Sequence, residues 1–247
     1  MQNRGGGDLE PTTQGFRDGR FAFTLAEVLI TLGIIGIVAA LTMPVLIANY
    51  QKKNVVVNLE KAYTNLSQAI KLSEASNGEL EYWDFGMPAK DFFNKYLYNF
   101  VSVNNSTFNS QDLQYKYLNG NNCTEILCTE NSYIVFLSDG MLLIVSSANF
   151  LSDGRVISID INGLKKPNIV GKDFFSFALT KNNGIVPFGA GNFGISDGEG
   201  GSQSFGTFDR DKLKGNNSYA CNREKKGYWC AALIMFDNWT IKKDYPW

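Results

Sequence analysis

Histidine is absent from this chain of 247 residues. Without an imidazole, the chain has no Ser-His-Asp or Cys-His arrangement for nucleophilic catalysis and no histidine-ligated zinc site. Its carboxylates offer no substitute, because the Asp and Asn residues lie mostly in turn contexts and no carboxylate pair stands out. We therefore predict that the protein is not an enzyme.

An excess of charge of one sign is also missing. The 23 basic and 24 acidic residues leave a formal net charge of -1. A surface that binds nucleic acid needs an excess of positive charge. The basic cluster of Arg223, Lys225 and Lys226 is interpreted as a solvated loop, so no nucleic-acid site is predicted.

Only one long apolar run occurs, and it lies near the N-terminus. Residues 28–48 carry no charge, and Glu27 stands at the start of this run. At about 1.5 Å per residue, the run is long enough to cross the roughly 30 Å hydrocarbon layer of a membrane. A secretory signal would be cut after its apolar run, but Ala48-Asn49-Tyr50 is a poor site of that kind. A lone carboxylate at the end of a membrane segment needs a partner or a task.

Residues 22–40 resemble the N-terminal cleavage and methylation segment of type IV prepilins and of the pseudopilins of type II secretion systems. In that family, a peptidase at the inner face of the membrane cuts after a small residue and methylates the new N-terminus, which is usually Phe. The resemblance places the cut between Ala22 and Phe23, with Arg17 and Arg20 as the basic residues of the leader. It therefore implies an N-methylated Phe23.

The same family requires a Glu five residues into the mature chain, and Glu27 occupies that position. The resemblance implies that Glu27 serves in methylation and in assembly. It also implies four partners, which are prepilin peptidase, other pilin or pseudopilin subunits, an inner-membrane assembly platform and membrane lipid.

Helix-weakening residues lie inside the apolar run, at Gly33, Gly36 and Pro44. Proline removes a backbone donor and clashes with the preceding turn, which predicts a kink or a loosened turn. One interpretation is that Gly and Pro are simply frequent in membrane helices. The other, implied by the resemblance, is that the stretch between Gly36 and Pro44 extends when the subunit leaves the bilayer for a filament. Both interpretations predict a helix in the resting subunit.

Beyond the membrane segment, apolar residues recur at steps of three and four, which is typical of an amphipathic helix. We expect this helix to continue the membrane helix, to end at Asn77-Gly78 and to bury its apolar stripe against the C-terminal part of the chain. The stripe consists of Val55, Val56, Leu59, Ala62, Tyr63, Leu66, Ala69, Ile70 and Ser73.

Residues 78–247 are numerous enough to bury one core of their own. The apolar runs 133–137 and 141–145 are joined by Ser-Asp-Gly, which predicts a β-hairpin, and 156–161 alternates as a further strand. We expect an antiparallel sheet of three or four strands. The predicted fold class is α+β and pilin-like, with a long N-terminal helix packed against a C-terminal antiparallel sheet.

Three other segments of this head have weaker patterns. Residues 92–100 are expected to form a short helix, and the Gly- and Ser-rich residues 189–206 a long surface loop. The closing residues 228–247 are rich in aromatic side chains and are interpreted as a final hairpin in the core, with subunit contacts as the alternative.

The four cysteines form two local pairs, Cys123 with Cys128 and Cys221 with Cys230. Even number and close pairing favour disulfides in an oxidising compartment over a zinc site or free thiols.

Oxygen ligands at the turn that follows residue 159 give a weak calcium signal, with Asp160, Asn162 and Asp173 as the candidates. Turn chemistry alone explains these residue types, and Lys165 and Lys166 add positive charge. We therefore predict no cofactor, with calcium kept as the alternative.

Together these patterns predict a leader at 1–22, a membrane and assembly helix at 23–48, an amphipathic continuation at 49–77 and an exported β-rich head at 78–247. The expected function is that of a structural subunit, a pilin or pseudopilin, of a type IV pilus-like or type II secretion filament. The expected location is the bacterial inner membrane, with one crossing and the head in the periplasm or outside the cell. The alternative is a membrane-anchored periplasmic binding or adhesion module that uses the segment only for export.

Overall fold

The protein is described by a computed structural model that covers residues 23–104, 113–124, 132–147, 151, 153–191, 193–196, 202–205 and 209–247. The chain divides into two compact units, Met1–Ile47 and Ala48–Trp247. The expected leader at 1–22 lies outside the described residues.

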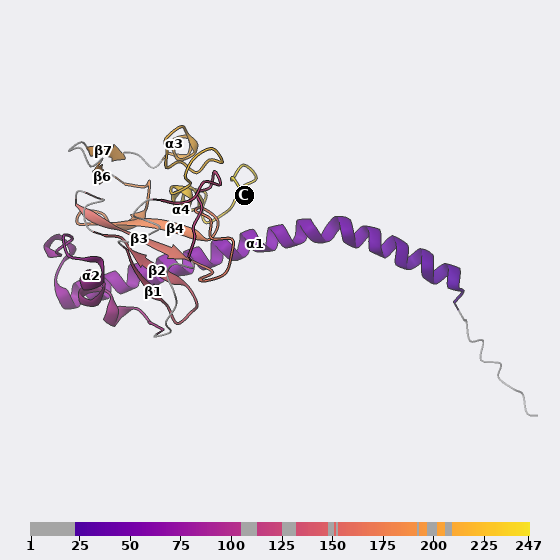
Figure 1. The fold of residues 1–247 in the computed structure, drawn as a ribbon, viewed down its shortest axis with the longest axis horizontal. Helices are drawn as coiled ribbons and strands as arrows, with labels where there is room; N and C mark the ends of the chain where they lie inside the picture. The colour runs from indigo at the N-terminus through magenta and orange to yellow at the C-terminus, as the bar shows by residue number, and fades with distance from the viewer. Residues whose placement is uncertain are drawn as a thin grey trace, which may run out of the picture. The chain divides into compact units, whose positions relative to one another are not determined.

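The first element, α1, is a helix over Leu25–Asn77 (Figure 1). It continues without interruption past Gly33, Gly36 and Pro44, as both interpretations of those residues required of the resting subunit. Its end at Asn77 confirms the predicted stop, and Gly78 follows with a φ of 89°, a backbone conformation that glycine adopts readily.

In the second unit, α1 buries one face. All of the residues on this face belong to the predicted apolar stripe, because a 3.6-residue period brings them to one side of the helix. They are Val56, Leu59, Ala62, Leu66, Ala69, Ile70 and Ser73.

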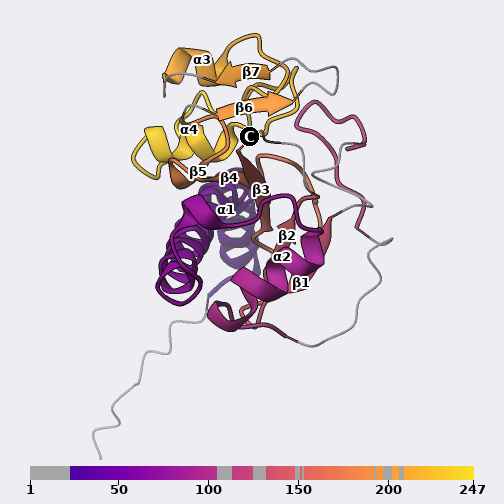
Figure 2. The ribbon, with the colours of Figure 1, turned by 90° about the vertical axis from the view of Figure 1, so that its left-hand side faces the viewer.

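The core of this unit is an antiparallel sheet in which sequential strands are neighbours (Figure 2). It has five strands rather than the expected three or four, because the sequence patterns did not predict its two C-terminal strands. The sheet order is β1 (Tyr133–Phe136), β2 (Leu142–Val145), β3 (Gly154–Asp160), β4 (Phe174–Thr180) and β5 (Gly184–Pro187).

The predicted hairpin joins β1 to β2. The Leu137 N–H donates to the Met141 carbonyl at 2.9 Å, and Gly140 takes a φ of 89° in the turn. The Asp139 carboxylate accepts from the Met141 N–H at 3.3 Å, as turn aspartates do. The pairing of Ile134 with Ile144 then fixes the register of the two strands.

Aromatic side chains connect α1 to the sheet. The Tyr63 ring stacks on Phe177 of β4 with centroids 5.6 Å apart, and the Tyr63 hydroxyl donates to the Ile185 carbonyl of β5 at 3.3 Å. The confirmed layout is therefore α+β and pilin-like, a long N-terminal helix with a C-terminal sheet.

A short helical segment follows α1 and packs on β1 and β2. It contains η1 (Leu80–Tyr82), α2 (Ala89–Tyr96) and η2 (Tyr98–Phe100), so the helix expected over 92–100 begins three residues earlier and ends in a 3-10 turn. Trp83 stacks on Tyr96 with centroids 4.3 Å apart.

Buried Arg155 of β3 holds this helical segment to the sheet. Its guanidinium donates to the Phe85 carbonyl at 2.8 Å and also to the Met87 carbonyl, and it lies 4.4 Å from the centroid of the Phe92 ring. Burial lowers the pKa of Arg155 to about 10.

The C-terminal part departs from two predictions. The expected loop at 189–206 contains a two-stranded antiparallel pair, β6 (Phe193–Ser196) and β7 (Ser202–Phe205), because strand pairing uses backbone groups and tolerates small polar residues. The expected final hairpin is instead a helix, α4 (Cys230–Phe236), which follows α3 (Arg210–Lys214) and packs on β4 and β5. Ala231, Leu233 and Ile234 of α4 are buried, as the core interpretation required.

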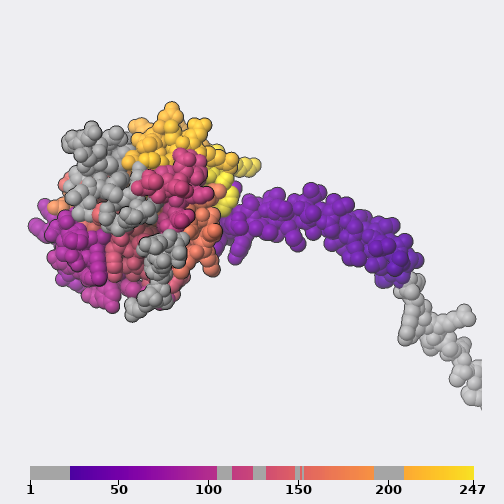
Figure 3. Space-filling model, viewed as in Figure 1, coloured from indigo at the N-terminus to yellow at the C-terminus, as the bar shows by residue number. Residues whose placement is uncertain are grey.

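The surface view shows residues 113–124 beside the C-terminal part of the chain (Figure 3). The N–H groups of Leu118 and Asn119 donate to the carbonyls of Lys226 and Lys225, each at 3.1 Å. Segments separated by about a hundred residues thus form one unit.

Candidate processing and assembly site

The N-terminal turn of α1 carries the predicted processing residues. The Glu27 carboxylate accepts hydrogen bonds from the Thr24 N–H at 2.8 Å and from the Thr24 hydroxyl at 2.9 Å. In return, the Glu27 N–H donates to the Thr24 hydroxyl oxygen at 3.2 Å. This is a capping box, in which Thr24 and Glu27 satisfy donors that a helix start leaves free.

The capping box fixes where the Glu27 charge lies. It holds the carboxylate beside the start of the helix, on the N–H group of Thr24, which directly follows Phe23. Both Phe23 and Glu27 are exposed. Ala22, the residue expected before the cut, lies outside the described residues. The sequence signal for Glu27 came from a resemblance, whereas its pairing with Thr24 follows the spacing Thr-x-x-Glu and was missed.

The helix beyond Glu27 exposes nearly all of its apolar side chains in the first unit. Over residues 25–47 it rises about 35 Å, which exceeds the roughly 30 Å hydrocarbon core of a bilayer. It is long and apolar enough to cross a membrane, and no residue in its most apolar stretch is buried. Such a surface requires lipid or other helices around it.

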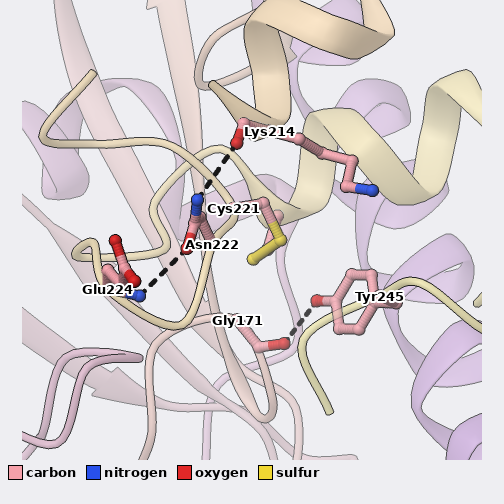
Figure 4. The surroundings of a disulfide bond; sticks show 7 residues. Gly171, Lys214, Cys221, Asn222, Glu224 and Tyr245 are labelled. Atoms are coloured by element: carbon pink, nitrogen blue, oxygen red, sulfur yellow. Dashed lines mark hydrogen bonds between the residues drawn. A yellow bond between two sulfur atoms is a disulfide. The ribbon is translucent and has the colours of Figure 1, made fainter. Parts of the chain in front are cut away.

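A disulfide joins Cys221 to Cys230 at the start of α4, as predicted, with Cα atoms 4.7 Å apart (Figure 4). The backbone of Gly171, with φ of 82°, lies directly against it. A Cβ at this position would stand 2.7 Å from the Cys230 sulfur. Cys123 is also disulfide-bonded, while its expected partner Cys128 lies outside the described residues.

The C-terminal segment is held at the same place. The Tyr245 hydroxyl donates to the Gly171 carbonyl, and Figure 4 shows this tyrosine across from the disulfide. Arg210 of α3 pairs with Asp237 at 2.8 Å and with Asp244 at 2.9 Å. Burial opposes ionisation of Asp237, but hydrogen bonds from Arg210 and Lys242 hold its pKa below the usual value.

The three calcium candidates come together, but their carboxylate oxygens accept hydrogen bonds from the chain itself. The Asp160 carboxylate accepts from the Tyr115 hydroxyl at 2.8 Å and from the N–H groups of Asn162 and Gly163. The Asp173 carboxylate accepts from the Asn162 side-chain amide at 3.1 Å and from two backbone N–H groups. This arrangement orders the turn between β3 and β4.

The charge of Asp173 also acts on Asp160. Burial, and then the charge of Asp173, raise the pKa of Asp160 to about 7, although the hydrogen bond from Tyr115 opposes this shift. Burial likewise raises the pKa of Asp173 and that of Tyr115. Within the part of the chain that the structure describes, no group of three or more His, Cys, Asp or Glu side chains is arranged to hold a metal ion.

An interpretation of the sequence as free of the Gly-x-Ser-x-Gly spacing is wrong. Residues 194–198 read Gly-Ile-Ser-Asp-Gly, the spacing of a hydrolase nucleophile elbow. An elbow requires a strand-to-helix turn and a histidine base, whereas β6 pairs with β7 and the chain has no histidine. The spacing therefore gives no support to hydrolase chemistry.

Comparison with known families agrees with the resemblance at the N-terminus. Residues 17–43 match the prokaryotic N-terminal methylation motif, which is the type IV prepilin-like signal segment. The motif implies processing by prepilin peptidase and assembly with other pilins, and proteins of the pilin type are structural. With its apolar helix and disulfide, the chain fits this class of membrane-anchored, surface-exposed proteins.

The chain belongs to DUF6613, a family of unknown function, whose model matches residues 45–247. That match covers the second unit and the end of the apolar segment. The comparison with curated proteins gave no match, and neither did the comparison with solved structures.

Proposed function

We propose that this chain is a pilin or pseudopilin that is cut between Ala22 and Phe23, methylated on Phe23 and assembled into a type IV pilus-like or type II secretion filament. The observation that carries the proposal is the methylation motif at 17–43, whose residues from Leu25 onward belong to helix α1. The same proposal places the head in the periplasm or outside the cell, an oxidising location in which the Cys221–Cys230 disulfide persists.

The exposed apolar side chains of α1 support assembly by helix packing. Gly33 and Gly36 have nothing within 4 Å of an added Cβ, so both present open backbone to a neighbour. Small residues of this kind let helices approach closely where lipid alternatives are equally apolar. In the proposed filament, the apolar side chains of each helix contact neighbouring helices instead of lipid. The stretch between Gly36 and Pro44 is where α1 extends.

Glu27 supplies the specificity of this packing. In the proposed filament, its carboxylate is buried and meets the N-terminal amine of Phe23 on an adjoining subunit. Pairing the two charges offsets the desolvation of each. The capping box supports this role, because it directs the carboxylate toward the N-terminal end of α1.

Two substitutions separate charge pairing from helix capping. Glu27→Gln removes the charge but keeps a side chain that serves in a capping box, whereas Thr24→Ala removes the capping hydroxyl and keeps the charge. We expect Glu27→Gln to abolish surface filaments and Thr24→Ala to retain them. The measurement is the amount of this chain in filaments sheared from cells, with the Cys221–Cys230 disulfide as the control for a folded head.

A normal filament yield from Glu27→Gln would refute the proposed pairing. If the unsubstituted chain stays in the membrane and enters no filament, the assembly role itself is wrong, and the chain is a membrane-anchored binding module.

A further inference from the structure

Two segments of the second unit carry lysines and no acidic residue. Residues 48–59 of α1 include Lys52 and Lys53, and residues 161–172 between β3 and β4 include Lys165, Lys166 and Lys172. We call these five lysines the basic collar. Clustered positive charges attract ligands of opposite charge.

The structure brings the two segments together around one cavity of about 350 Å³. From α1, the amide side chains of Gln51, Asn54 and Asn58 line it, and from the other segment Lys166 and Lys172 do so. Asp173 also lines the cavity, and its carboxylate accepts hydrogen bonds from the chain itself. Amide and ammonium groups are donors, which suit an anionic group with several acceptor oxygens.

An aromatic side chain completes the cavity. Trp247 lines it, and the Lys52 ammonium lies 5.7 Å from the centroid of the Trp247 ring. Tryptophan next to lysine is typical of the interface between membrane and water, where the ring lies at headgroup level.

Within the part of the chain that the structure describes, the lysines of the collar are not paired with acidic side chains. Among the described residues, none of its five lysines forms an ion pair within 4.0 Å. The buried Asp173 is the acidic residue of the cavity, and its carboxylate already accepts hydrogen bonds from the N–H groups of Asn168 and Ile169. Asp160 is also buried and accepts from the Tyr115 hydroxyl. Lys53, Lys165 and Lys166 are exposed to solvent.

Chain connectivity limits how far the collar can lie from the membrane surface. Gln51 is four residues beyond Ile47 in sequence, and a fully extended chain spans at most about 14 Å over four residues. Headgroup regions extend roughly 5 to 8 Å beyond the hydrocarbon on each side, and charges act over a further ~8 Å at physiological salt. Leu164, which precedes the two adjacent lysines, is 51% exposed and offers an apolar contact.

We propose that the basic collar binds the anionic phospholipid surface of the membrane that anchors the chain, with a headgroup phosphate in the cavity beside Lys166 and Lys172. The inference rests on the membrane anchoring in the proposed function and goes beyond it, because it assigns a lipid-binding surface to the head. It gives the subunit a salt-sensitive contact with the bilayer that must break before the subunit enters a filament.

The test places the full chain in nanodiscs of either anionic phosphatidylglycerol or zwitterionic phosphatidylcholine. A spin label on Leu164→Cys reports contact of the collar with lipid, through its accessibility to oxygen and to a water-soluble nickel complex. Tyr82→Cys, at an exposed position beyond the far end of α1, is the matched control. Both positions are exposed, so neither label disturbs the core.

We expect the Leu164 label to be shielded from nickel in phosphatidylglycerol only, and the Tyr82 label to be accessible in both lipids. Each lysine near an anionic surface contributes about fivefold to binding, so Lys165→Gln with Lys166→Gln lowers the ratio of docked to free heads about 25-fold. High salt should also lower the ratio of docked to free heads, because it screens the attraction between the lysines and the lipid.

Equal nickel accessibility of the Leu164 label in both lipids would overturn the inference while leaving the anchoring intact. If the chain inserts into neither kind of nanodisc, the membrane anchoring itself is wrong. The proposed contact of the head with lipid is then also wrong.

Discussion

The buried Asp160 carboxylate makes a measurable prediction about stability and pH. Its pKa is about 7 in the folded chain, raised from 3.8 by burial and then by Asp173. Between these two values, the folded state holds a proton that the unfolded state has released. The contribution of Asp160 to stability is therefore full below its unfolded pKa and is lost as the pH rises through 7.

The size of the effect follows from the two pKa values. Between about pH 5 and pH 8, the Asp160 contribution to the free energy of unfolding falls by about 2.5 kcal/mol. Asp160→Asn removes this titration, so the difference in unfolding free energy between the two proteins shifts by that amount across the range. Asp153→Asn, at an exposed position just before the same strand, is the matched control.

The assay is chemical unfolding of the full chain in detergent micelles, followed by tryptophan fluorescence at several pH values. Comparing each variant with the unsubstituted protein cancels the opposite contribution of carboxylates such as Asp237, whose pKa is lowered. If Asp160→Asn and the unsubstituted protein show the same pH dependence of stability, the pKa of Asp160 is not raised in the folded chain.

Three further substitutions test the packing of the head. Replacing Cys221 and Cys230 together by Ser should lower the free energy of unfolding by about 2.5 kcal/mol, since the bond closes a short loop; an unchanged denaturation midpoint would contradict this. Gly171→Ala should lower the free energy of unfolding by about 3 kcal/mol, because the added Cβ meets the Cys230 sulfur. Gly120 also has a positive φ but lies in open space, so Gly120→Ala should lower it by about 1 kcal/mol. Equal losses would refute the close contact at Gly171. Arg155→Met should lose about 3 kcal/mol by leaving buried carbonyls without a donor, and a neutral result in the same unfolding assay would show that they find other partners.

Elements defined by local patterns were predictable from the sequence. The apolar stripe of α1 repeats at the helical period over many turns, and Ser138-Asp139-Gly140 defines the β1–β2 hairpin locally. The nine-residue spacing of Cys221 and Cys230 likewise suggested their bond.

Two buried elements of the head, β4 and α4, were not predicted. The residues of β4 read Phe-Phe-Ser-Phe-Ala-Leu-Thr and show no regular alternation of apolar and polar positions, whereas β3, which is equally buried, does alternate. The apolar run of α4 is seven residues long, and periodicity does not separate a buried helix from a buried strand at that length.

The candidate sites show the same division. The motif that contains Glu27 is contiguous in sequence, so the sequence suffices to find it. The contacts of Arg155 with Phe85, and of Tyr115 with Asp160, join residues separated by 70 and 45 positions. Such contacts depend on the completed sheet, and no local pattern predicts them.

The central claim is that the chain is a processed prepilin, and the mass of its mature N-terminus tests this most directly. The account predicts that protein purified from the native membrane begins at Phe23 and carries one N-methyl group. An intact leader, or a cut after Ala48, would contradict the account, because the first retains the leader and the second removes the helix that assembly requires.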